Sequence, residues 1–502
     1  MGSYRRCMEA LSPISLKSAV RITMITHLMK KLQNDSGKHK SIHQSPRPMT
    51  ETITLSIKKK EFELAYLVQF TLVLIALIGN PFAASANPVN LPDPFSDNKA
   101  LVEKTLESTE EEAKRTQNES NSSNQQSPKS LDGRDGRELL LRNFRPNIKL
   151  KTSVSVKRSA KYPVVDVHTH FRHKLRQSEQ ALDDYVKVMD RNQIAICCSL
   201  DGRLDSELDE HMGFLWRKHR ERFTIFVNID WRGNGDPNEP STWNCHQQGF
   251  AARTAKQIER AVEKGASGLK IFKQFGLGYK NPDGSLIKID DKRFDPIWEA
   301  CGRLGIPVII HTADPAAFFD PIDETNERWE ELSRHPDWSF HGPNYPSRAE
   351  LHAARNRVIE RHPQTNFIGA HVANQAEDLT EVSQWLERYP NLWIETASRI
   401  AELGRQPYSA RDFLLKYQNR IMFGTDGPWP ELRLQINWRF FESRDESFHY
   451  SEKQPPPQGL WRIHAINLPD NVLRKLYYEN ASKLIPGVKE RLAFHLQNGN
   501  QN

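Results

Sequence analysis

Eight short apolar runs, separated by longer amphipathic stretches, constrain the fold of this chain more than any other feature. The runs are rich in Val, Ile, Leu and Phe, and intervening stretches such as residues 251–264 show helical spacing and end before a glycine. Apolar strands that alternate with helices indicate a parallel sheet covered on both faces. The runs are residues 164–168, 194–199, 223–229, 268–272, 307–311, 367–371, 392–396 and 421–426.

Eight such units within residues 159–490 predict an α/β fold of the (β/α)8 type, a TIM barrel. A doubly wound open sheet is the alternative, but no G-x-G-x-x-G motif follows the first run, which argues against a dinucleotide-binding fold. Two long segments, 312–348 after the fifth strand and 427–461 after the eighth, mix aromatic, charged and proline residues. They predict either packing across the barrel mouth or a lid over a substrate pocket. Residues 491–502 form a polar tail.

The beginning of the chain predicts export. An apolar run at 64–78 follows three lysines at 58–60 and precedes Ala-Ser-Ala at 84–86, which is the pattern of a secretory signal peptide. We therefore expect residues 1–86 to be a leader that is cleaved after Ala86, with Met49 as an alternative start. The mature protein would be periplasmic or extracellular. An uncleaved membrane anchor is the alternative, although the apolar run is shorter than the roughly 20 residues of a spanning helix.

Charge and composition limit the partners that the protein can have. Residues 1–86 hold 12 Lys and Arg against 5 Asp and Glu, which accounts for the whole net charge of +7. The rest of the chain is neutral overall, which argues against nucleic acid as a partner. Residues 87–158 are rich in Asn, Ser, Gln, Glu and Lys and predict a disordered polar linker. We expect a small-molecule substrate, contact with a membrane only through an uncleaved leader, and leave a homodimer open.

Polar residues gather at the carboxyl ends of the predicted strands, where TIM barrels carry their active sites. Strict alternation along the first strand would place Asp166, His168 and His170 on one face. Two imidazoles two residues apart on one face can bind a single metal ion. The other strand-end residues are Lys270 on the fourth strand, His311 on the fifth, His371 on the sixth and Asp426 on the eighth. A set of three histidines and one aspartate, here His168, His170, His311 and Asp426, suits Zn²⁺, with Mn²⁺, Fe²⁺ or Co²⁺ as alternatives.

Each of these residues alone has a simpler explanation. Asp426 could cap a loop, His371 could be a core histidine with satisfied hydrogen bonds, and Lys270 could extend its amine to the barrel mouth. Their occurrence together, in order and at strand ends, favours a metal site.

Residues 162–486 resemble the amidohydrolase superfamily, and within it the amidohydrolase-related branch. This branch includes aminocarboxymuconate-semialdehyde decarboxylase, resorcylate-type decarboxylases and pyrone-dicarboxylate lactonase. The motifs that carry the resemblance are VDVHTH (165–170), GLK (268–270), VIIHT (308–312), GAH (369–371), FGTD (423–426) and ENASKLI (479–485).

The resemblance implies roles for the strand-end residues. His168, His170, His311 and Asp426 would bind one divalent metal ion, and Asp426 would also act as the base. His371 would polarise the substrate or orient the attacking water. Lys270 stands where some branches carry a carbamylated lysine that bridges two metal ions, in which case His371 would bind the second ion.

Three basic residues near the strand ends are candidates for binding a substrate carboxylate. Arg203 follows the second strand, Lys273 follows the fourth and Arg399 follows the seventh. Guanidinium groups in such positions can bind a carboxylate through two hydrogen bonds.

The motifs and the resemblance together imply an exported, metal-dependent hydrolase of a small ester, lactone or amide that bears a carboxylate. It would act through metal-activated water. A metal-dependent non-oxidative decarboxylase of a small aromatic or unsaturated acid is the first alternative. A catalytically inactive binding protein tethered at the cell surface is the second. The product, an acid formed with uptake of water or CO₂, distinguishes the hydrolase from the decarboxylase.

Overall fold

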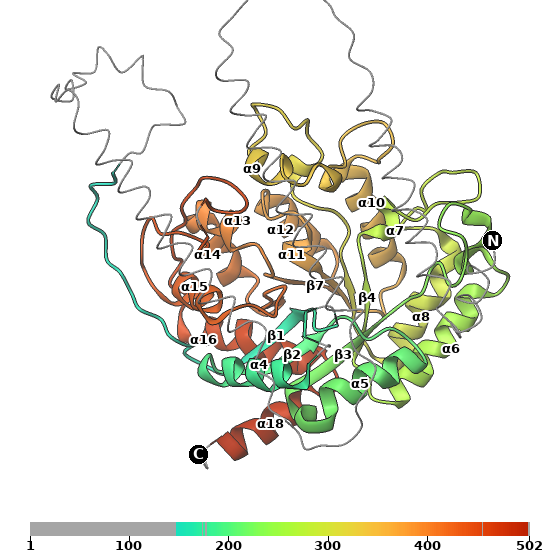
Figure 1. Cartoon of the computed structure of the whole chain (residues 1–502), viewed down its shortest axis with the longest axis horizontal. Helices are drawn as coiled ribbons and strands as arrows, with labels where there is room; N and C mark the ends of the chain where they lie inside the picture. The colour runs from blue at the N-terminus through green and yellow to red at the C-terminus, as the bar shows by residue number, and fades with distance from the viewer. Residues whose placement is uncertain (1–146, 173, 176–177, 454, 500–502) are drawn as a thin grey trace, which may run out of the picture. The chain divides into compact units, whose positions relative to one another are not determined.

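The computed structural model describes residues 147–172, 174–175, 178–453 and 455–499. Eight parallel strands follow one another in sequence order, and helices lie between them along the chain and surround them in space (Figure 1). The predicted (β/α)8 TIM barrel is therefore confirmed. The strands are β1 (Val164–Thr169), β2 (Ile194–Ser199), β3 (Phe223–Asn228), β4 (Gly268–Ile271), β5 (Val308–Ile310), β6 (Phe367–Gly369), β7 (Leu392–Glu395) and β8 (Ile421–Met422).

Two of the helices show clearly why they begin or end where they do. Ser347 and Glu350 form a capping box at the start of α10, and Gly305 ends α8 with a φ of 68°. The helices described are α4 (Glu179–Arg191), α5 (Ser206–His219), α6 (Phe250–Glu263), α7 (Gln274–Leu277), α8 (Asp295–Leu304), α9 (Trp329–Leu332), α10 (Arg348–Arg361), α11 (Ala370–Ala373), α12 (Leu379–Arg388), α13 (Ile400–Arg405), α14 (Pro407–Lys416), α15 (Glu431–Glu442), α16 (Asp470–Arg474), α17 (Asn480–Leu484) and α18 (Val488–Gly499).

Backbone hydrogen bonds join the first strand to the segment that follows the last strand. Asp426 N donates to His168 O at 2.8 Å and His170 N donates to Gly427 O at 2.6 Å. A parallel bridge also pairs Thr169 with Gly427. These bonds close the barrel and place the metal-binding candidates of β1 beside Asp426.

The strict alternation predicted for residues 165–170 is wrong at Asp166. The pairing of β1 with β2 shifts register between Asp166 and Thr169, so the side chains do not alternate evenly between the two faces. The Asp166 carboxylate does not join the histidines. It accepts hydrogen bonds from the hydroxyl and, at 3.0 Å, the backbone N–H of Thr425. Burial raises the pKa of Asp166 to about 7 although these hydrogen bonds act in the opposite direction.

Two apolar clusters make up the core. The larger cluster joins the strands to the surrounding helices. The smaller cluster includes Val167, Ile309, Ile368 and Met422, which come from strands on different sides of the barrel. Because apolar side chains fill the barrel with a packed core, the polar strand-end residues stand on a rigid base.

The structure refines the predicted domain limits at both ends of the barrel. Residues 155 and 157, which the prediction assigned to a disordered linker, contact the barrel: Ser155 Oγ donates to Asp445 at 2.8 Å, and Lys157 pairs with Glu442 at 3.6 Å. The predicted polar tail is helical as far as Gly499, within α18. The signal peptide, the alternative start at Met49 and most of the linker lie outside the described residues. Within the described residues, no helix is long and apolar enough to cross a membrane.

The two predicted long loops are present, and the first is tied down by a buried ion pair. The loop after β5 contains α9, and the loop after β8 contains α15, which the sequence did not predict as a helix. Arg328 in the first loop pairs with Glu402 of α13, and each side chain is only 1% exposed. Arg328 also pairs with Glu331 at 2.7 Å. The loop after β5 is therefore an integral part of the packed structure.

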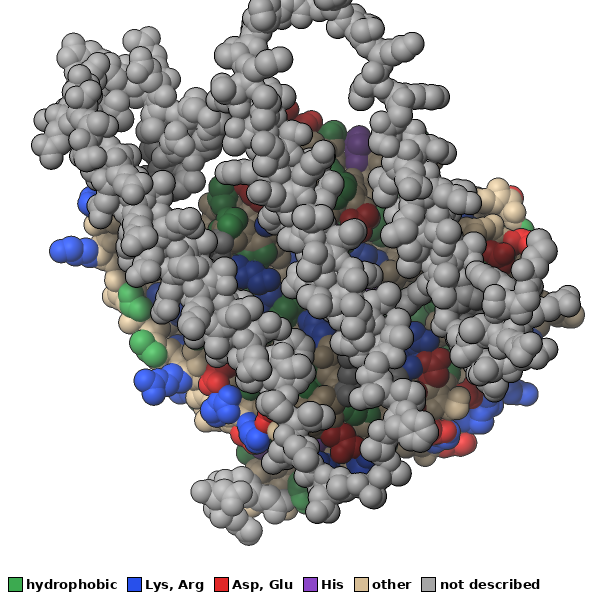
Figure 2. Space-filling view, viewed as in Figure 1, with side chains coloured by type: hydrophobic (Ala, Val, Ile, Leu, Met, Phe, Trp, Pro, Cys, Tyr) green, Lys and Arg blue, Asp and Glu red, His purple; other side chains and the backbone are tan. Residues whose placement is uncertain are grey.

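Charged side chains of both signs share the visible surface. Figure 2 shows lysine and arginine side chains interleaved with aspartate and glutamate along the lower edge of the described part. Among the exposed ion pairs of the described residues, Lys264 and Asp209 lie 2.7 Å apart. Exposed pairs of this kind contribute little to stability, about 0–1 kcal/mol each.

The buried pair gives a prediction about stability. Replacing Glu402 with Ala leaves the buried Arg328 guanidinium with only one carboxylate partner. We expect the free energy of unfolding to fall by about 3–5 kcal/mol, measured by denaturant titration. Glu327→Ala is the matched control, because Glu327 pairs with Arg405 at the surface and its loss should cost at most about 1 kcal/mol. Equal effects of the two substitutions would contradict this prediction.

Candidate active site

His168 is held by a carboxylate from another strand of the barrel. Its Nδ1 lies 2.9 Å from Glu395 Oε1 at the end of β7, and both side chains are buried. Glu395 also accepts hydrogen bonds from two backbone N–H groups, so it acts as the acceptor and Nδ1 carries the proton, which leaves Nε2 with a lone pair. Burial, together with the nearby Lys270, lowers the pKa of His168 well below its usual range. His168 is therefore a neutral imidazole, as a metal ligand must be.

His170 is held in the same way by a different carboxylate. Its Nδ1 lies 2.7 Å from Asp201 Oδ1, just after β2, and its Nε2 lies 3.3 Å from Asp426 Oδ1. Burial opposes the charged form, but the hydrogen bonds to Asp201 and Asp426 outweigh burial and raise the pKa of His170 to about 9. Without a metal ion, His170 therefore carries a proton at neutral pH.

Asp426 is the point at which the two histidines converge. Its Oδ1 lies 3.5 Å from His168 Nε2 and 3.3 Å from His170 Nε2. Its Oδ2 accepts a hydrogen bond of 3.2 Å from Ser398 Oγ. Burial opposes ionisation, but the hydrogen bond to His170 and the neighbouring imidazoles outweigh it and keep the pKa of Asp426 well below its usual range. The carboxylate is ionised throughout the neutral pH range.

These three residues fit a divalent metal ion. One ligand atom from each of His168, His170 and Asp426 lies within 4.8 Å of the others. Both imidazoles direct Nε2 toward Asp426 while a carboxylate holds Nδ1, the arrangement that orients histidine ligands in metal sites. One ligand atom from each of His168, His371 and Glu395 also lies within 4.8 Å of the others. The predicted ligands of β1 and Asp426 are thus brought together.

His371 lies beside this group with its orientation constrained. Its ring centroid is 4.8 Å from that of His168, and its Nδ1 donates to Ala397 O at 2.9 Å. Its backbone N–H donates to Glu395 Oε1 at 2.7 Å. Burial lowers the pKa of His371 well below its usual range, so the ring is neutral and Nε2 can only accept a hydrogen bond or a proton.

His371 also begins an unusual backbone turn. Residues His371 to Asn374 all have φ between 54° and 59°, a left-handed conformation that costs about 1–2 kcal/mol per non-glycine residue. Such conformations persist only where the surrounding structure imposes them, and they cluster at functional sites. The hydrogen bond from the His371 backbone to Glu395 is one of the constraints that impose it.

His311 lies near the site but outside the group of three. Its ring centroid is 4.6 Å from that of His371, and its Nε2 lies 3.2 Å from Asp314 Oδ1. Asp314 also forms an ion pair with Lys273, one of the predicted substrate-binding residues. The charge of Lys273 is therefore used to hold Asp314, and through it His311.

Lys270 is buried at the centre of the site. Its Nζ lies 3.4 Å from His168 Nε2. Burial lowers the pKa of Lys270 to about 8, although the carboxylates of Asp426, Glu395 and Asp201 act in the opposite direction. The amine is thus placed either to act as a proton donor near neutral pH or to react as a bridging lysine would.

The two predicted arginines stand in different surroundings. Arg203 is 51% exposed and forms an ion pair of 3.0 Å with Glu207. Arg399 is buried and donates from Nη1 to Ser398 O at 2.9 Å. Arg203 therefore already has a carboxylate partner, and Arg399 supports the backbone that carries the Ser398 hydroxyl.

Three functional residues were missed by the sequence prediction. They are the carboxylates that hold imidazole rings: Glu395, Asp201 and Asp314. Each follows the rule that identified the ligands, because each lies at or just after the carboxyl end of a strand. Applying that rule to acidic residues as well as histidines would have found them.

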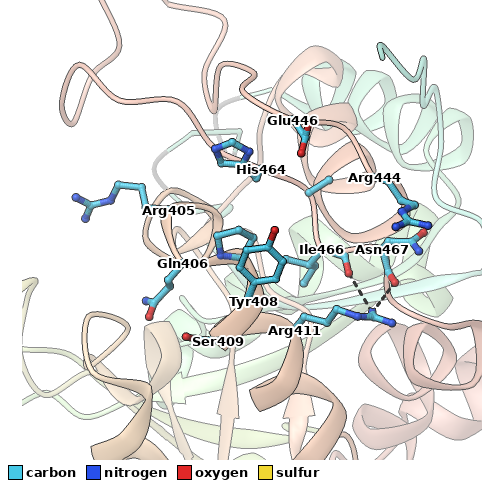
Figure 3. A pocket seen from close by; sticks show the side chains of 12 residues that line it. Arg405, Gln406, Tyr408, Ser409, Arg411, Arg444, Glu446, His464, Ile466 and Asn467 are labelled. Atoms are coloured by element: carbon cyan, nitrogen blue, oxygen red, sulfur yellow. Dashed lines mark hydrogen bonds between the residues drawn. The ribbon is translucent and has the colours of Figure 1, made fainter. Parts of the chain in front are cut away.

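A large pocket lies apart from these residues. It has a volume of about 700 Å³ and is lined by residues of α14 and of the segment before α16, including Tyr408, Arg411 and Asn467. Figure 3 shows Arg411 donating to the backbone carbonyls of Ile466 and Asn467. None of the residues that line this pocket belongs to the metal-binding group. The size of a pocket therefore does not identify the candidate active site in this structure.

The hydrogen bond behind His168 gives a first prediction. Gln in place of Glu395 keeps only one acceptor oxygen, so its N–H₂ group must face either the donors of His168 and His371 or the backbone N–H of Ala397. We expect metal affinity to fall about 10–100-fold, measured by competition with a chelator. Glu377→Gln is the matched control, since Glu377 pairs with Arg348 and does not contact a histidine. Unchanged metal affinity in Glu395→Gln would contradict the assignment.

The raised pKa of His170 gives a second prediction. Below pH 9 the free protein holds a proton on His170 that a metal ion must displace from Nε2. Metal affinity should therefore rise about tenfold per pH unit up to about pH 9 and then level off. Calorimetric titrations in buffers of different ionisation enthalpy should show about one proton released per ion at pH 7. Binding without proton release would contradict the protonated state of His170.

Comparison with known proteins agrees with the observed barrel. A family model described as amidohydrolase matches residues 165–487, and no curated protein sequence matches the chain. Three of the solved structures that are similar to this chain share 14–16% of its sequence. They are 2,6-dihydroxybenzoate decarboxylase from Rhizobium (16% identity, 65% of this chain and 98% of that one, TM-score 0.38), 5-carboxyvanillate decarboxylase from Novosphingobium aromaticivorans with manganese (14%, 66% and 99%, TM-score 0.36) and dihydroorotase from Campylobacter jejuni (14%, 64% and 82%, TM-score 0.37).

The family match and the geometry of the strand ends lead to one assignment. The matched residues span more than half of the chain and contain every member of the metal-binding group. The predicted resemblance is thereby confirmed: the chain belongs to the amidohydrolase family.

Proposed function

We propose that this protein is a metal-dependent hydrolase of a small ester, lactone or amide that bears a carboxylate. The observation that carries the proposal is the position of Asp426. One of its oxygens lies within 3.5 Å of both imidazole Nε2 atoms, and the other is held by Ser398. A carboxylate in this position can bind an ion and exchange a proton with a molecule beside that ion.

The donor set suits one divalent ion, which supplies Lewis-acid polarisation of the scissile carbonyl and activation of water when bound. Two imidazoles and a carboxylate favour Zn²⁺, with Mn²⁺, Fe²⁺ or Co²⁺ as alternatives. His168 and His170 would hold the ion through Nε2, and Asp426 through Oδ1. His311 would complete the set if its Nε2 turned from Asp314 toward the ion.

Asp426 Oδ2 would move the proton. It would take a proton from the attacking water as the water oxygen bonds to the carbonyl carbon. It would then deliver that proton to the departing oxygen or nitrogen as the ester or amide bond breaks. Ser398 Oγ, which donates to Oδ2, keeps this oxygen oriented toward the reacting atoms.

His371 would orient the water and not the carbonyl. Its Nδ1 proton is committed to Ala397 O, so Nε2 offers a lone pair. A lone pair can accept a hydrogen bond from water but cannot donate one to a carbonyl oxygen. Of the two roles expected for His371, the structure therefore supports the orientation of water.

A non-oxidative decarboxylase is the second candidate, and Lys270 is the observation that favours it. In that reaction the bond between the substrate carbon and its carboxylate breaks, CO₂ leaves, and the electron pair stays on carbon until a proton arrives. Lys270 has a pKa of about 8 and lies 3.4 Å from His168 Nε2, so it could supply that proton. Release of CO₂ without uptake of water would identify this reaction.

Substitution of Asp426 tests the proposal. Asn keeps the size and one coordinating oxygen but cannot accept a proton at neutral pH, so Asp426→Asn should keep its fold and most of its metal. We expect kcat to fall about 10²–10⁴-fold on an ester or lactone that the parent protein hydrolyses. His168→Ala should instead lose the metal itself, measured by elemental analysis.

Asp283→Asn is the control, since Asp283 accepts hydrogen bonds from Ser285 in an exposed turn. Near-normal kcat in metal-loaded Asp426→Asn would show that Asp426 is not the base. A metal-loaded parent protein that turns over no ester, lactone, amide or aromatic acid would favour the binding protein without activity.

A further inference from the structure

Two cations rest on one tryptophan close to Asp426. Lys174 Nζ lies 3.9 Å and Arg433 Cζ lies 3.5 Å from the centre of the Trp429 ring. Lys174 comes from the segment after β1, and Arg433 comes from α15 in the long loop after β8. At these distances the indole ring attracts both cations electrostatically.

The tryptophan is anchored to the strand end that carries Asp426. Trp429 Nε1 donates to Thr425 O at 2.8 Å, and Thr425 immediately precedes Asp426. Trp429 and Arg433 also line a small pocket together with Ser398, whose hydroxyl donates to Asp426 Oδ2. The two cations are therefore tied to the same short segment as the proposed base.

Neither cation has a carboxylate partner in the part of the chain that the structure describes. Within that part, no acidic oxygen lies within 4.0 Å of Lys174 Nζ or of the Arg433 guanidinium nitrogens. Glu452 and Asp426 act on Arg433 electrostatically but form no ion pair with it. By contrast, Arg203 and Lys273, two of the three cations that the sequence favoured, already have carboxylate partners. The third, Arg399, donates to the backbone carbonyl of Ser398.

From this geometry we infer that Lys174 and Arg433, held against Trp429, bind a carboxylate of the substrate while its reacting group lies at Asp426. The inference rests on the proposed function, and it names the residues that select a substrate with a second negative charge. A guanidinium stacked on a ring presents its N–H groups in its own plane, where they can hold both oxygens of a carboxylate.

The size of the pocket agrees with a small anionic group. Its volume is about 40 Å³, which is space for roughly three waters at about 10–15 Å³ each. A carboxylate has three heavy atoms. The pocket therefore accepts one charged end of a substrate and not a whole molecule.

Binding of two matched probes to the zinc-loaded full chain tests this inference. Isophthalate carries two carboxylates on one ring, and monomethyl isophthalate carries one. We expect isophthalate to bind about 10–100-fold more tightly in the parent protein, measured by calorimetry. In Arg433→Gln this ratio should fall to near one, whereas affinity for the monomethyl ester should stay within about twofold.

Two further variants make the test specific. Lys174→Gln should lower the ratio by a smaller factor, about threefold, because Lys174 is exposed. It also provides an independent measurement if Arg433→Gln fails to fold. Arg444→Gln is the matched control, an exposed arginine in the same long loop whose loss should leave the ratio unchanged.

Three outcomes would overturn the inference: equal affinity for the two probes in the parent protein, no binding of isophthalate at millimolar concentration, or an unchanged ratio in Arg433→Gln. The last of these would mean that the cations only cover Trp429. Because these measurements need no turnover, a protein inactive on every substrate could still show the expected ratio. That result would contradict the proposed hydrolase activity but would still support a carboxylate-binding site at Lys174 and Arg433.

Discussion

The backbone hydrogen bonds that join β1 to the segment after β8 are the constraint on which the site depends. They run from Asp426 N to His168 O and from His170 N to Gly427 O. Without them the two histidines and Asp426 would lie at opposite edges of an open sheet. Barrel closure therefore does two things at once: it completes the pairing of the strands, and it brings residues more than 250 positions apart to one point.

Carboxylates then determine what the imidazoles can do. Glu395, Asp201 and Asp314 each contact one histidine ring, and the first two leave Nε2 directed toward Asp426. In a dry setting such hydrogen bonds are strong, and an unpaired partner would be costly. Glu395 and Asp201 therefore stabilise the fold and also orient the two imidazoles toward the position of a metal ion.

In the proposed function, the long loops add selectivity to this rigid centre. The loop after β5 is tied down by the buried pair of Arg328 and Glu402. The loop after β8 supplies Trp429 and Arg433 beside Asp426. Chemistry thus comes from strand ends, whose geometry the barrel imposes, whereas the proposed recognition of substrate charge comes from loops, whose composition can change without disturbing the barrel.

The sequence by itself determined the barrel and most of its candidate chemistry. Apolar runs of strand length can be buried only in a sheet covered by the helices between them, and His168, His170, His371 and Asp426 stand where such strands end. Only the tertiary structure decided that Asp166 turns away to Thr425 and that Glu395 holds His168. It also decided that Lys174 and Arg433 lie against Trp429 without a carboxylate partner among the described residues, whereas Arg203 and Lys273 each have one. The physical reason is range: strand periodicity acts over a few neighbouring residues, whereas hydrogen bonds and ion pairs depend on distances between segments that only barrel closure and loop packing establish.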